Sequence, residues 1–365
     1  MKKTFKHLEL FSGIGGFRKA IDLYCKDNDL ISKCVGFSEI DKYALTTYKS
    51  NYNTLGEKDI GDIDRFTSDI ENIKLLEDFD ILSAGFPCQA FSMMGNKKGF
   101  DDCRGNLFYN IINILLVKQP KYALLENVRN IKTHDGGRTY TEILRSLNDD
   151  AGYFVTSNIF NTADFGLPQT RRRMIFLAIR NDLIDRTESI DLCNEEVKSL
   201  FSELNHPISL KKYDNVLDGV LERNVEKKYY LSERIKPTIL SDGSKNFKSK
   251  SDINQMIARP LTATMVKMHR ACQDNYYSDE FINTKNHENY IKKFIPKHEL
   301  IKMKIRKITP LEALRLQGFD ESFYQNACES GVSNHQLYKQ AGNAVSVNTI
   351  YAVLNFLFNK KIIEM

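Results

Sequence analysis

Cys88 stands where a reactive thiol is expected. It follows Gly85-Phe86-Pro87, which ends the apolar run 79–84. In parallel sheets ligands bind beyond the carboxyl ends of the strands, so a residue at this point is well placed for chemistry. Pro87 fixes one backbone dihedral beside the thiol and so helps to orient it. Most single cysteines are structural, but this pattern favours a nucleophilic thiolate.

A glutamate and two arginines stand at the ends of later apolar runs. Glu126 closes the run 122–125, where a carboxylate is costly to bury unless it has a partner or a task. Arg171 and Arg173 precede the next run, and their spacing of two places both on one face of an extended chain. Guanidinium groups there suit a base carbonyl, a phosphate or Glu126 itself. From these residues alone, a capping or ion-paired glutamate and a solvated basic face remain alternatives.

A glycine-rich turn, Phe-Ser-Gly-Ile-Gly-Gly at 11–16, separates an apolar run from a helical pattern. Glycines let a ligand approach the backbone, and the start of the helix offers free amides. Glu39 ends the next apolar run, where a carboxylate can accept hydrogen bonds from ribose hydroxyls. Arg18 replaces the third glycine of the pyrophosphate-binding pattern, which favours a nucleoside without pyrophosphate over NAD or ATP. A plain strand–turn–helix explains this stretch equally well.

Short apolar runs and helical patterns alternate from residue 1 to residue 190. This alternation predicts a parallel sheet of the βαβ type. Strands are predicted at 7–11, 34–38, 79–84, 122–125, 156–161 and 173–179, and helices at 17–24, 43–48, 107–117 and 139–147. From 191 to 305 the alternation fades and Lys, Asn, Ser, Asp and Tyr become frequent, which predicts a second, less regular domain.

The composition predicts a soluble cytoplasmic protein with a sizeable core. Hydrophobic residues make up 42% of the chain, with 22 Phe and 17 Tyr. No apolar run reaches the roughly 18 residues of a membrane helix, and the N-terminus lacks the apolar centre of a signal peptide. The 7 cysteines show neither CxxC nor zinc-site spacing, which predicts reduced thiols and no metal site. A net charge of +5 is compatible with a nucleic-acid partner but does not require one.

Five motifs together resemble the bacterial DNA cytosine-5 methyltransferase family of the restriction–modification type. They are the turn at 11–16, Gly-Phe-Pro-Cys-Gln-Ala-Phe-Ser at 85–92, Glu-Asn-Val at 126–128, Gln-Thr-Arg-Arg-Arg at 169–173 and Gln-Ala-Gly-Asn-Ala-Val at 340–345. They occur in the family's order and span nearly the whole chain. The resemblance implies an α/β fold, in which a Rossmann-like S-adenosylmethionine-dependent methyltransferase domain carries a second, smaller target-recognition domain.

The same resemblance implies domain boundaries. A catalytic domain is expected at 1–190, a target-recognition domain at 191–305 and a linking element at 306–333. A C-terminal helix at 334–365, carrying Asn343, is expected to complete the catalytic domain beside the cofactor.

The resemblance further implies roles for the site residues. Cys88 would add to carbon 6 of a cytosine flipped out of duplex DNA, while Glu126 would bind ring nitrogen 3 and the amine. Arg173 would contact the cytosine carbonyl, and Arg171 would hold the carboxylate or the cysteine region. S-adenosylmethionine would be the methyl donor, leaving as S-adenosylhomocysteine, and its implied contacts are Phe11, Gly13, Gly15, Glu39, Asp62, Pro87, Leu107 and Asn343. Ser92 and Thr264 are implied to contact DNA.

The implied partner is double-stranded DNA, bound by a monomer that is functionally paired with a restriction endonuclease and associated with the bacterial nucleoid through DNA. Three alternatives remain beside this interpretation. The same chemistry on tRNA is disfavoured by the long Lys- and Tyr-rich middle segment, and an NAD-dependent oxidoreductase by Arg18 and the Gly-Phe-Pro-Cys strand end. A catalytically inactive DNA-binding relative is disfavoured because the cysteine, the glutamate and both arginines are present.

Overall fold

The structure, a computed structural model, describes residues 2–87, 107–184, 190–204, 208–244, 247–248, 251–265, 267, 269–270 and 272–363. The chain divides into two units. Unit 1 comprises residues 1–161, 172–210 and 345–365, and unit 2 comprises residues 162–171 and 211–344. The boundary after residue 210 differs from the expected one after residue 190, because α7 (Asn194–Ser202) packs on α15 (Val347–Asn359) within unit 1.

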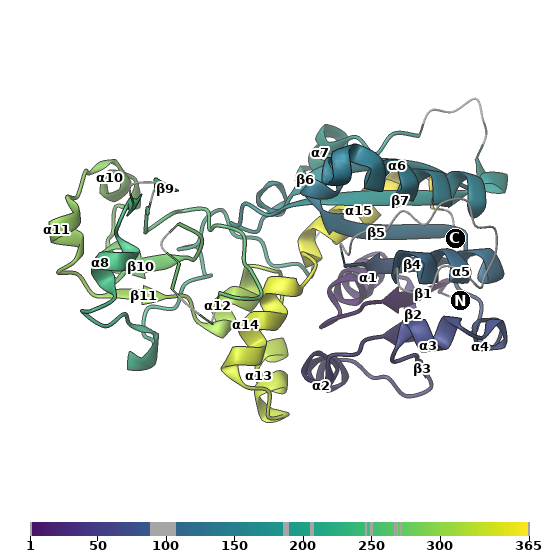
Figure 1. Ribbon diagram of the computed structural model, residues 1–365, viewed down its shortest axis with the longest axis horizontal. Coiled ribbons are helices and arrows are strands. Elements are labelled where there is room, and N and C mark those ends of the chain that lie inside the picture. The colour runs from purple at the N-terminus through teal and green to yellow at the C-terminus, as the bar shows by residue number, and fades with distance from the viewer. Residues whose placement is uncertain are drawn as a thin grey trace. The chain divides into compact units, whose positions relative to one another are not determined.

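Unit 1 is built on a seven-stranded sheet in the order β3-β2-β1-β4-β5-β7-β6 (Figure 1). The strands are β1 (Thr4–Leu10), β2 (Ile31–Ser38), β3 (Lys58–Asp59), β4 (Ile81–Gly85), β5 (Tyr122–Val128), β6 (Tyr153–Asn161) and β7 (Arg172–Arg180). The six predicted strands are confirmed with somewhat different ends, and the short β3 is additional. The strand order reverses between β1 and β4, and in such sheets the crevice at the reversal is the usual ligand site.

The predicted parallel sheet of the βαβ type has one exception, the strand β7. The pairs β1–β2, β2–β3, β1–β4 and β4–β5 are parallel, whereas β7 is antiparallel to both β5 and β6. The β6–β7 link, Thr162–Arg171, contains no α-helix, and antiparallel strands need no crossover helix between them. The reversed direction brings the first residues of β7 to the edge where the parallel strands end.

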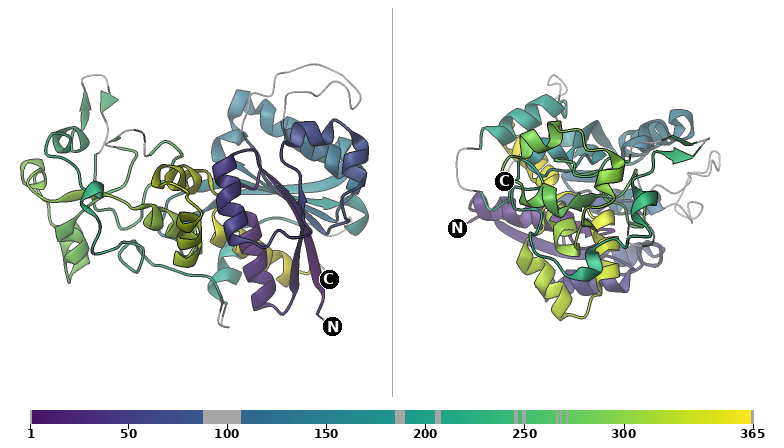
Figure 2. Two further views of the ribbon diagram at one scale, coloured as in Figure 1. Left: turned by 90° about the horizontal axis from the view of Figure 1, so that it is seen from below. Right: turned by 90° about the vertical axis from the view of Figure 1, so that its left-hand side faces the viewer.

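Helices cover the two faces of this sheet (Figure 2). The helices of unit 1 are α1 (Gly16–Asp27), α2 (Lys42–Asn51), α3 (Ile63–Thr67), α4 (Ile70–Lys74), α5 (Leu107–Lys118), α6 (Arg138–Arg145), α7 and α15. The predicted helices are confirmed as α1, α2, α5 and α6. Helix α15 packs against α1 and α7, whereas α5 packs against α3 and α4.

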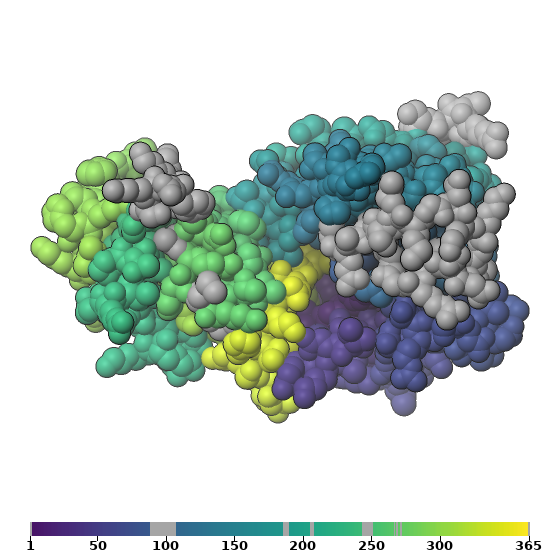
Figure 3. All heavy atoms as spheres, in the orientation of Figure 1, coloured from purple at the N-terminus to yellow at the C-terminus, as the bar shows by residue number. Residues whose placement is uncertain are grey.

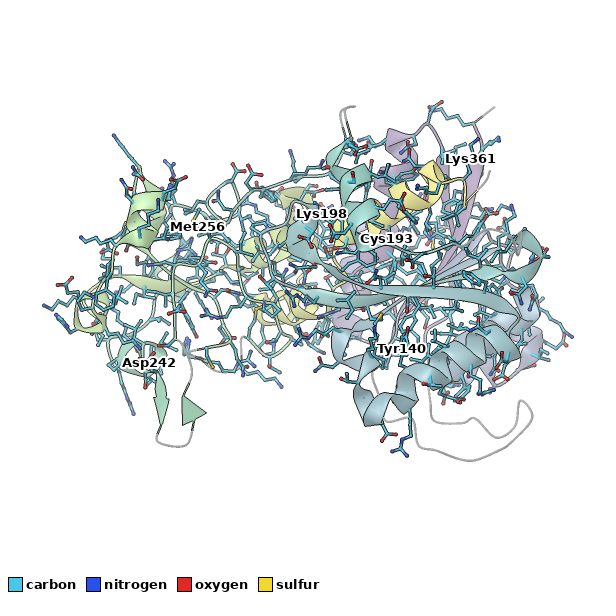
Figure 4. All side chains as sticks on the ribbon, turned by 90° about the horizontal axis from the view of Figure 1, so that it is seen from above. Tyr140, Cys193, Lys198, Asp242, Met256 and Lys361 are labelled. Carbon is cyan, nitrogen blue, oxygen red and sulfur yellow. The ribbon has the colours of Figure 1, made fainter. Side chains whose placement is uncertain are left out.

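Alternation along β1 explains why the sheet has two apolar faces. Successive side chains of a strand point to opposite faces. Leu8 and Leu10 join the core cluster that includes residues of α3, α5 and α6. Phe5 contacts Phe358 of α15 instead, with the ring centroids 5.5 Å apart. Tyr140 of α6 lies against the sheet, where its hydroxyl is 2.8 Å from that of Ser157 in β6 (Figure 4).

Unit 2 is less regular, as expected for its polar sequence. Its helices are α8 (Lys236–Ile239), α9 (Asp279–Asn283), α10 (His287–Lys292), α11 (Lys297–Leu300), α12 (Pro310–Arg315), α13 (Glu321–Glu329) and α14 (Asn334–Asn343). Two antiparallel pairs join β8 (Gly243–Ser244) to β9 (Phe247–Lys248) and β10 (Tyr276–Ser278) to β11 (Ile305–Lys307). A small core of Leu231, Ile239, Leu240, Tyr276 and Ile305 is completed by Ile235, Ile253, Leu300, Ile301 and Met303. Figure 3 shows one face of the surface that encloses the cores of the protein.

A fully buried ion pair connects β11 to α12 in unit 2. Arg306 donates to both carboxylate oxygens of Glu312 at 2.9 and 2.7 Å, and neither side chain is exposed. Glu312 also accepts from the backbone amide of Thr309, whose hydroxyl accepts from the amide of Glu312. This reciprocal arrangement is a capping box, which satisfies two amides at the start of the helix.

One stretch of the described residues, Asn334–Asn359, is long and apolar enough to cross a membrane by length and composition alone. It comprises two helices, α14 and α15, and 83% of its most apolar window is buried within the protein. Core helices of soluble proteins pass the same test, so this stretch is weak evidence for a membrane span.

Candidate active site

Most of the expected site residues of unit 1 lie at one edge of the sheet. The carboxyl ends of β1, β2, β4 and β5 meet at this edge because the strands are parallel. Phe11, Glu39 and Pro87 follow the first three of these strands, and Glu126 lies near the end of the fourth. Arg173 reaches the same edge from the start of the antiparallel β7.

The glycine turn has a strained backbone that Glu39 holds in place. Phe11, Gly13 and Gly15 have φ values of +52°, +56° and +82°, in the left-handed region that non-glycine residues rarely adopt. The Gly13 amide donates to Oε2 of Glu39 at 2.8 Å, and the Ser12 amide donates to the carbonyl of Ser38 at 2.9 Å. The turn is therefore bonded directly to the end of β2.

This corner fits a nucleoside with free ribose hydroxyls. Oε1 of Glu39 accepts from the amides of Ile40 and Asp41 at 2.8 and 2.7 Å, while Oε2 accepts from Gly13. A carboxylate oxygen can accept two hydrogen bonds, so Oε2 keeps capacity for a hydroxyl. The buried hydroxyl of Ser12 has no partner among the described groups. A Cβ built on Gly13 would meet no atom of the described residues within 4 Å, so the backbone borders open space among them.

Asp62 is connected to the same corner through the backbone. The Ser38 hydroxyl donates to the carbonyl of Gly61 at 2.9 Å, which joins the end of β2 to the start of α3. Asp62 caps α3 by accepting from the amide of Asp64 at 3.0 Å, and the residue is exposed. Its expected contact with the adenine amine stays a prediction.

Glu126 and Arg173 form an ion pair across β5 and β7. The Nε of Arg173 lies 2.9 Å from Oε1 of Glu126, and the side chains are 21% and 11% exposed. In the ladder Glu126 is opposite Ile175, so Arg173 is its diagonal neighbour on the same face. A Cβ on Gly85 would lie 3.6 Å from Oε2 of Glu126, which shows how closely the carboxylate approaches β4. A planar guanidinium beside a carboxylate presents several hydrogen-bonding groups at one point of the edge.

Asn127 is a site residue that sequence reasoning did not single out. Its side chain is 2% exposed, and its Nδ2 donates to the carbonyl of Phe86 at 3.0 Å. This bond fixes the backbone one residue before the exposed Pro87. The motif Glu-Asn-Val includes this residue. Only the hydrogen bond to Phe86 shows that Asn127 holds the turn after β4.

Of three further expected site residues, the structure describes Leu107 but not Cys88 or Ser92. Leu107 begins α5 and packs against the core cluster. Cys88 and Ser92 lie outside the described residues.

Arg171, expected to hold the carboxylate or the cysteine region, binds backbone carbonyls in the described contacts. It is 2% exposed and donates to the backbone carbonyls of Leu261, Gly342 and Ala344 at 3.1, 3.2 and 2.9 Å. The last two carbonyls end α14, where cations are favoured by the helix dipole. These bonds give Arg171 a structural task within unit 2, and a catalytic role for it stays a prediction.

The remaining expected residues also belong to unit 2. Asn343 is the last residue of α14 and is exposed. The helix that completes unit 1 is α15, and this differs from the expectation that the Asn343 helix would do so. Thr264 lies in an exposed turn and accepts from Arg270 at 3.1 Å, while Arg270 also donates to Thr262 and pairs with Asp274. Contacts of Asn343 with cofactor and of Thr264 with DNA stay predictions.

Comparisons with known proteins give one consistent result. The sequence model of the C-5 cytosine-specific DNA methylase family matches residues 5–359. The Type II methyltransferase M1.ScrFI of Lactococcus lactis subsp. cremoris is 37% identical over 352 residues, covering 96% of this chain and 77% of that protein. The Type II methyltransferase M.HpaII of Haemophilus parainfluenzae is 33% identical, covering 100% of this chain and 90% of its own length.

Solved structures agree on the fold. The S. pombe Dnmt2 methyltransferase has a TM-score of 0.68 at 21% identity, covering 98% of this chain and 100% of that one. The Entamoeba histolytica methyltransferase EhMeth has a TM-score of 0.69 at 21% identity, with both chains covered completely. Unit 1 therefore has the expected Rossmann-like methyltransferase fold, and the chain belongs to the C-5 cytosine-specific DNA methylase family.

Proposed function

We propose that this chain methylates carbon 5 of cytosine in duplex DNA, with S-adenosylmethionine as donor and Cys88 as nucleophile. The single observation that carries the proposal is the Glu126–Arg173 pair, which lies at the sheet edge beside the turn that Asn127 holds. That turn leads directly into Cys88 in the sequence. Cytosine activation needs a nucleophile, a carboxylate and a guanidinium, and the last two lie together at this edge.

Carbon 5 of cytosine is a weak nucleophile and needs activation by the protein. The Cys88 thiolate adds to carbon 6, the carbon 5–carbon 6 double bond opens, and its electron pair makes carbon 5 electron-rich. Glu126 binds ring nitrogen 3 and the exocyclic amine, and as an acid it supplies the proton that offsets the developing charge. Arg173 donates to the cytosine carbonyl at position 2.

The donor supplies an electrophilic methyl group that carbon 5 can attack. In this proposal Glu39 binds the ribose hydroxyls of the donor and Asp62 its adenine amine. The turn 11–16 and the first amides of α1 bind the carboxylate of the donor. After transfer, a base removes the carbon 5 proton. The electron pair of the broken carbon 5–hydrogen bond restores the carbon 5–carbon 6 double bond. The carbon–sulfur bond breaks at the same time and releases the Cys88 thiolate.

Access to carbon 6 requires that the cytosine leave the base stack, since enzymes that modify bases act on flipped or unpaired nucleotides. In this proposal unit 2, which contains residues 211–305 of the expected recognition domain 191–305, contacts the DNA around the flipped base. Because M1.ScrFI and M.HpaII are named Type II methyltransferases, we further propose that the chain acts as a cytoplasmic monomer, functionally paired with a restriction endonuclease.

The first experiment incubates the full chain with tritiated S-adenosylmethionine and unmethylated genomic DNA, and then sequences the product for 5-methylcytosine. Label at one recurring short motif is the expected result. A parallel reaction contains tRNA in place of DNA. Label in tRNA without label in DNA would reject DNA as the substrate, and label in neither would reject the proposed activity.

Replacing Glu126 by Gln is expected to lower the methyl-transfer rate by a factor on the order of 100, because the side chain loses its acid–base function. Single-turnover rates with saturating donor and DNA measure this effect. The control is Glu142→Gln on α6, since Glu142 also pairs with an arginine, Arg145, but on the surface. The control is expected to retain the wild-type rate. An unchanged rate in Glu126→Gln would reduce Glu126 to a structural role.

A further inference from the structure

A buried charged cluster lies behind the glycine turn, on β1, α1 and the segment after α2. Arg18 is 6% exposed, and its guanidinium donates to both oxygens of Glu57 at 2.8 and 2.7 Å. Its backbone amide donates to Glu9, a fully buried carboxylate whose pKa is raised to about 8 by burial. Bidentate arginine–carboxylate pairs fix geometry as well as charge. The proposed catalytic steps use none of these groups.

Tyr52, the residue that follows α2, connects this cluster to the glycine turn. The guanidinium carbon of Arg18 lies 4.6 Å from the centre of the Tyr52 ring, within the range of a cation–π contact. On the other side, the Tyr52 hydroxyl donates to the carbonyl of Gly15 at 2.8 Å. A Cβ on Gly15 would lie only 2.4 Å from the ring, so the ring and the turn are in direct contact.

The turn needs such external support because of its backbone conformation. Phe11, Gly13 and Gly15 all have positive φ, and conformations of this kind persist when the surrounding structure determines them. Two of the supporting bonds come from the end of β2, through Ser38 and Glu39. The bond from Tyr52 acts at the other end of the turn, where α1 begins.

We propose that Tyr52, supported by the Arg18–Glu57 pair, is a positioning residue that orders the glycine turn for binding of S-adenosylmethionine. This inference rests on the proposed function. The role of Tyr52 is indirect, since its hydroxyl bonds a backbone carbonyl of the turn and not the donor itself. Without the hydroxyl, part of the ordering takes place on binding, and the affinity decreases accordingly.

The test is Tyr52→Phe in the full chain, which keeps the ring and removes the hydroxyl. Loss of one hydrogen bond is expected to raise the calorimetric Kd for S-adenosylmethionine by about 3- to 10-fold. The rate at saturating donor is expected to stay at the wild-type value, so the effect appears in KM and not in kcat. Amide hydrogen exchange in the peptide covering residues 12–17 is expected to become faster in the free protein.

The matched control is Tyr48→Phe. The Tyr48 hydroxyl belongs to the same cluster, donating to Glu9 at 3.2 Å and accepting from Arg18 at 3.1 Å, but no hydrogen bond joins it to the turn in the described contacts. This variant is expected to lose thermal stability and to keep wild-type donor affinity. Equal weakening in both variants would indicate general loosening of the cluster and overturn the proposal.

The remaining outcomes distinguish a failure of the Tyr52 role from a failure of the proposed methyltransferase function. Wild-type affinity and unchanged exchange in Tyr52→Phe, with normal binding by the wild-type protein, would overturn the role of Tyr52 alone. Absence of donor binding by the wild-type protein would overturn the proposed function and this inference with it. Slower turnover at saturating donor in Tyr52→Phe would place the residue in the chemical step and also contradict a positioning role.

Discussion

Replacing Cys88 by Ser is expected to lower methyl transfer to DNA by a factor on the order of a thousand or more, since the nucleophile starts the reaction. A serine hydroxyl is similar in size but is far less easily ionised than a thiol, so it cannot add to carbon 6 at a useful rate. Binding of DNA and of the donor is expected to remain near the wild-type level, because neither depends on the covalent bond. Single-turnover methylation and gel-shift titration measure the two quantities separately.

The control for this variant is Cys193→Ser. Cys193 stands at the N-cap of α7, a position where serine is favoured, so the control is expected to keep both activity and stability. DNA with 5-fluorocytosine at the target should trap the wild-type protein covalently, since fluorine cannot leave as a proton does. Full turnover by Cys88→Ser, or no trapping on DNA that is demonstrably bound, would exclude the covalent route.

Replacing Arg306 by Met is expected to destabilise unit 2 by about 3–5 kcal/mol, the usual cost of breaking a buried pair by removing one partner. Glu312 would keep the amides of Thr309 and Glu222 as donors but would lose both bonds from the guanidinium. Urea titration followed by far-UV circular dichroism measures the change. A loss below about 1 kcal/mol, typical of exposed pairs, would show that the pair contributes little.

The loss of stability in Arg306→Met should also depend on pH in a defined direction. Burial already raises the pKa of Glu312 above its ordinary value, and Arg306 opposes this shift. Without Arg306 the folded variant binds a proton that its unfolded chain releases at the same pH. Its stability should therefore fall, relative to wild type, as the pH rises. The double variant Arg306→Met with Glu312→Gln removes the unpaired charge and keeps one acceptor oxygen, so it should recover much of the stability.

Much of unit 1 could be predicted because its elements are local patterns. The apolar run before Glu126 and the one that begins at Arg173 are recognisable from their own residues. The direction of β7 could not be predicted in this way, since direction depends on how the link Thr162–Arg171 returns the chain to the sheet. The Glu126–Arg173 pair follows from that direction, so from the sequence Glu126 was only one of three possible partners for the arginines.

Contacts with backbone atoms were the least predictable part of the site. Asn127 donates to the carbonyl of Phe86, and Tyr52 donates to that of Gly15, over separations of 41 and 37 residues. A carbonyl is present at every position of a chain, so no pattern of side chains marks it as a partner. The three backbone carbonyls that Arg171 binds were likewise not predicted from its sequence pattern.

The division of the chain has a consequence for exchanging recognition parts between relatives. The chain passes between the units after residues 161, 171, 210 and 344, so the segment 162–171 would stay behind in a graft of 211–344. Its Gln169 side chain donates to the carbonyl of Leu316 and accepts from the amide of Leu261, and Arg171 likewise bonds main-chain carbonyls. Main-chain partners survive a change of side chain. A foreign recognition segment needs only the same backbone path around Leu261 and Leu316. Gln169 and Arg171 can then bind it without being changed.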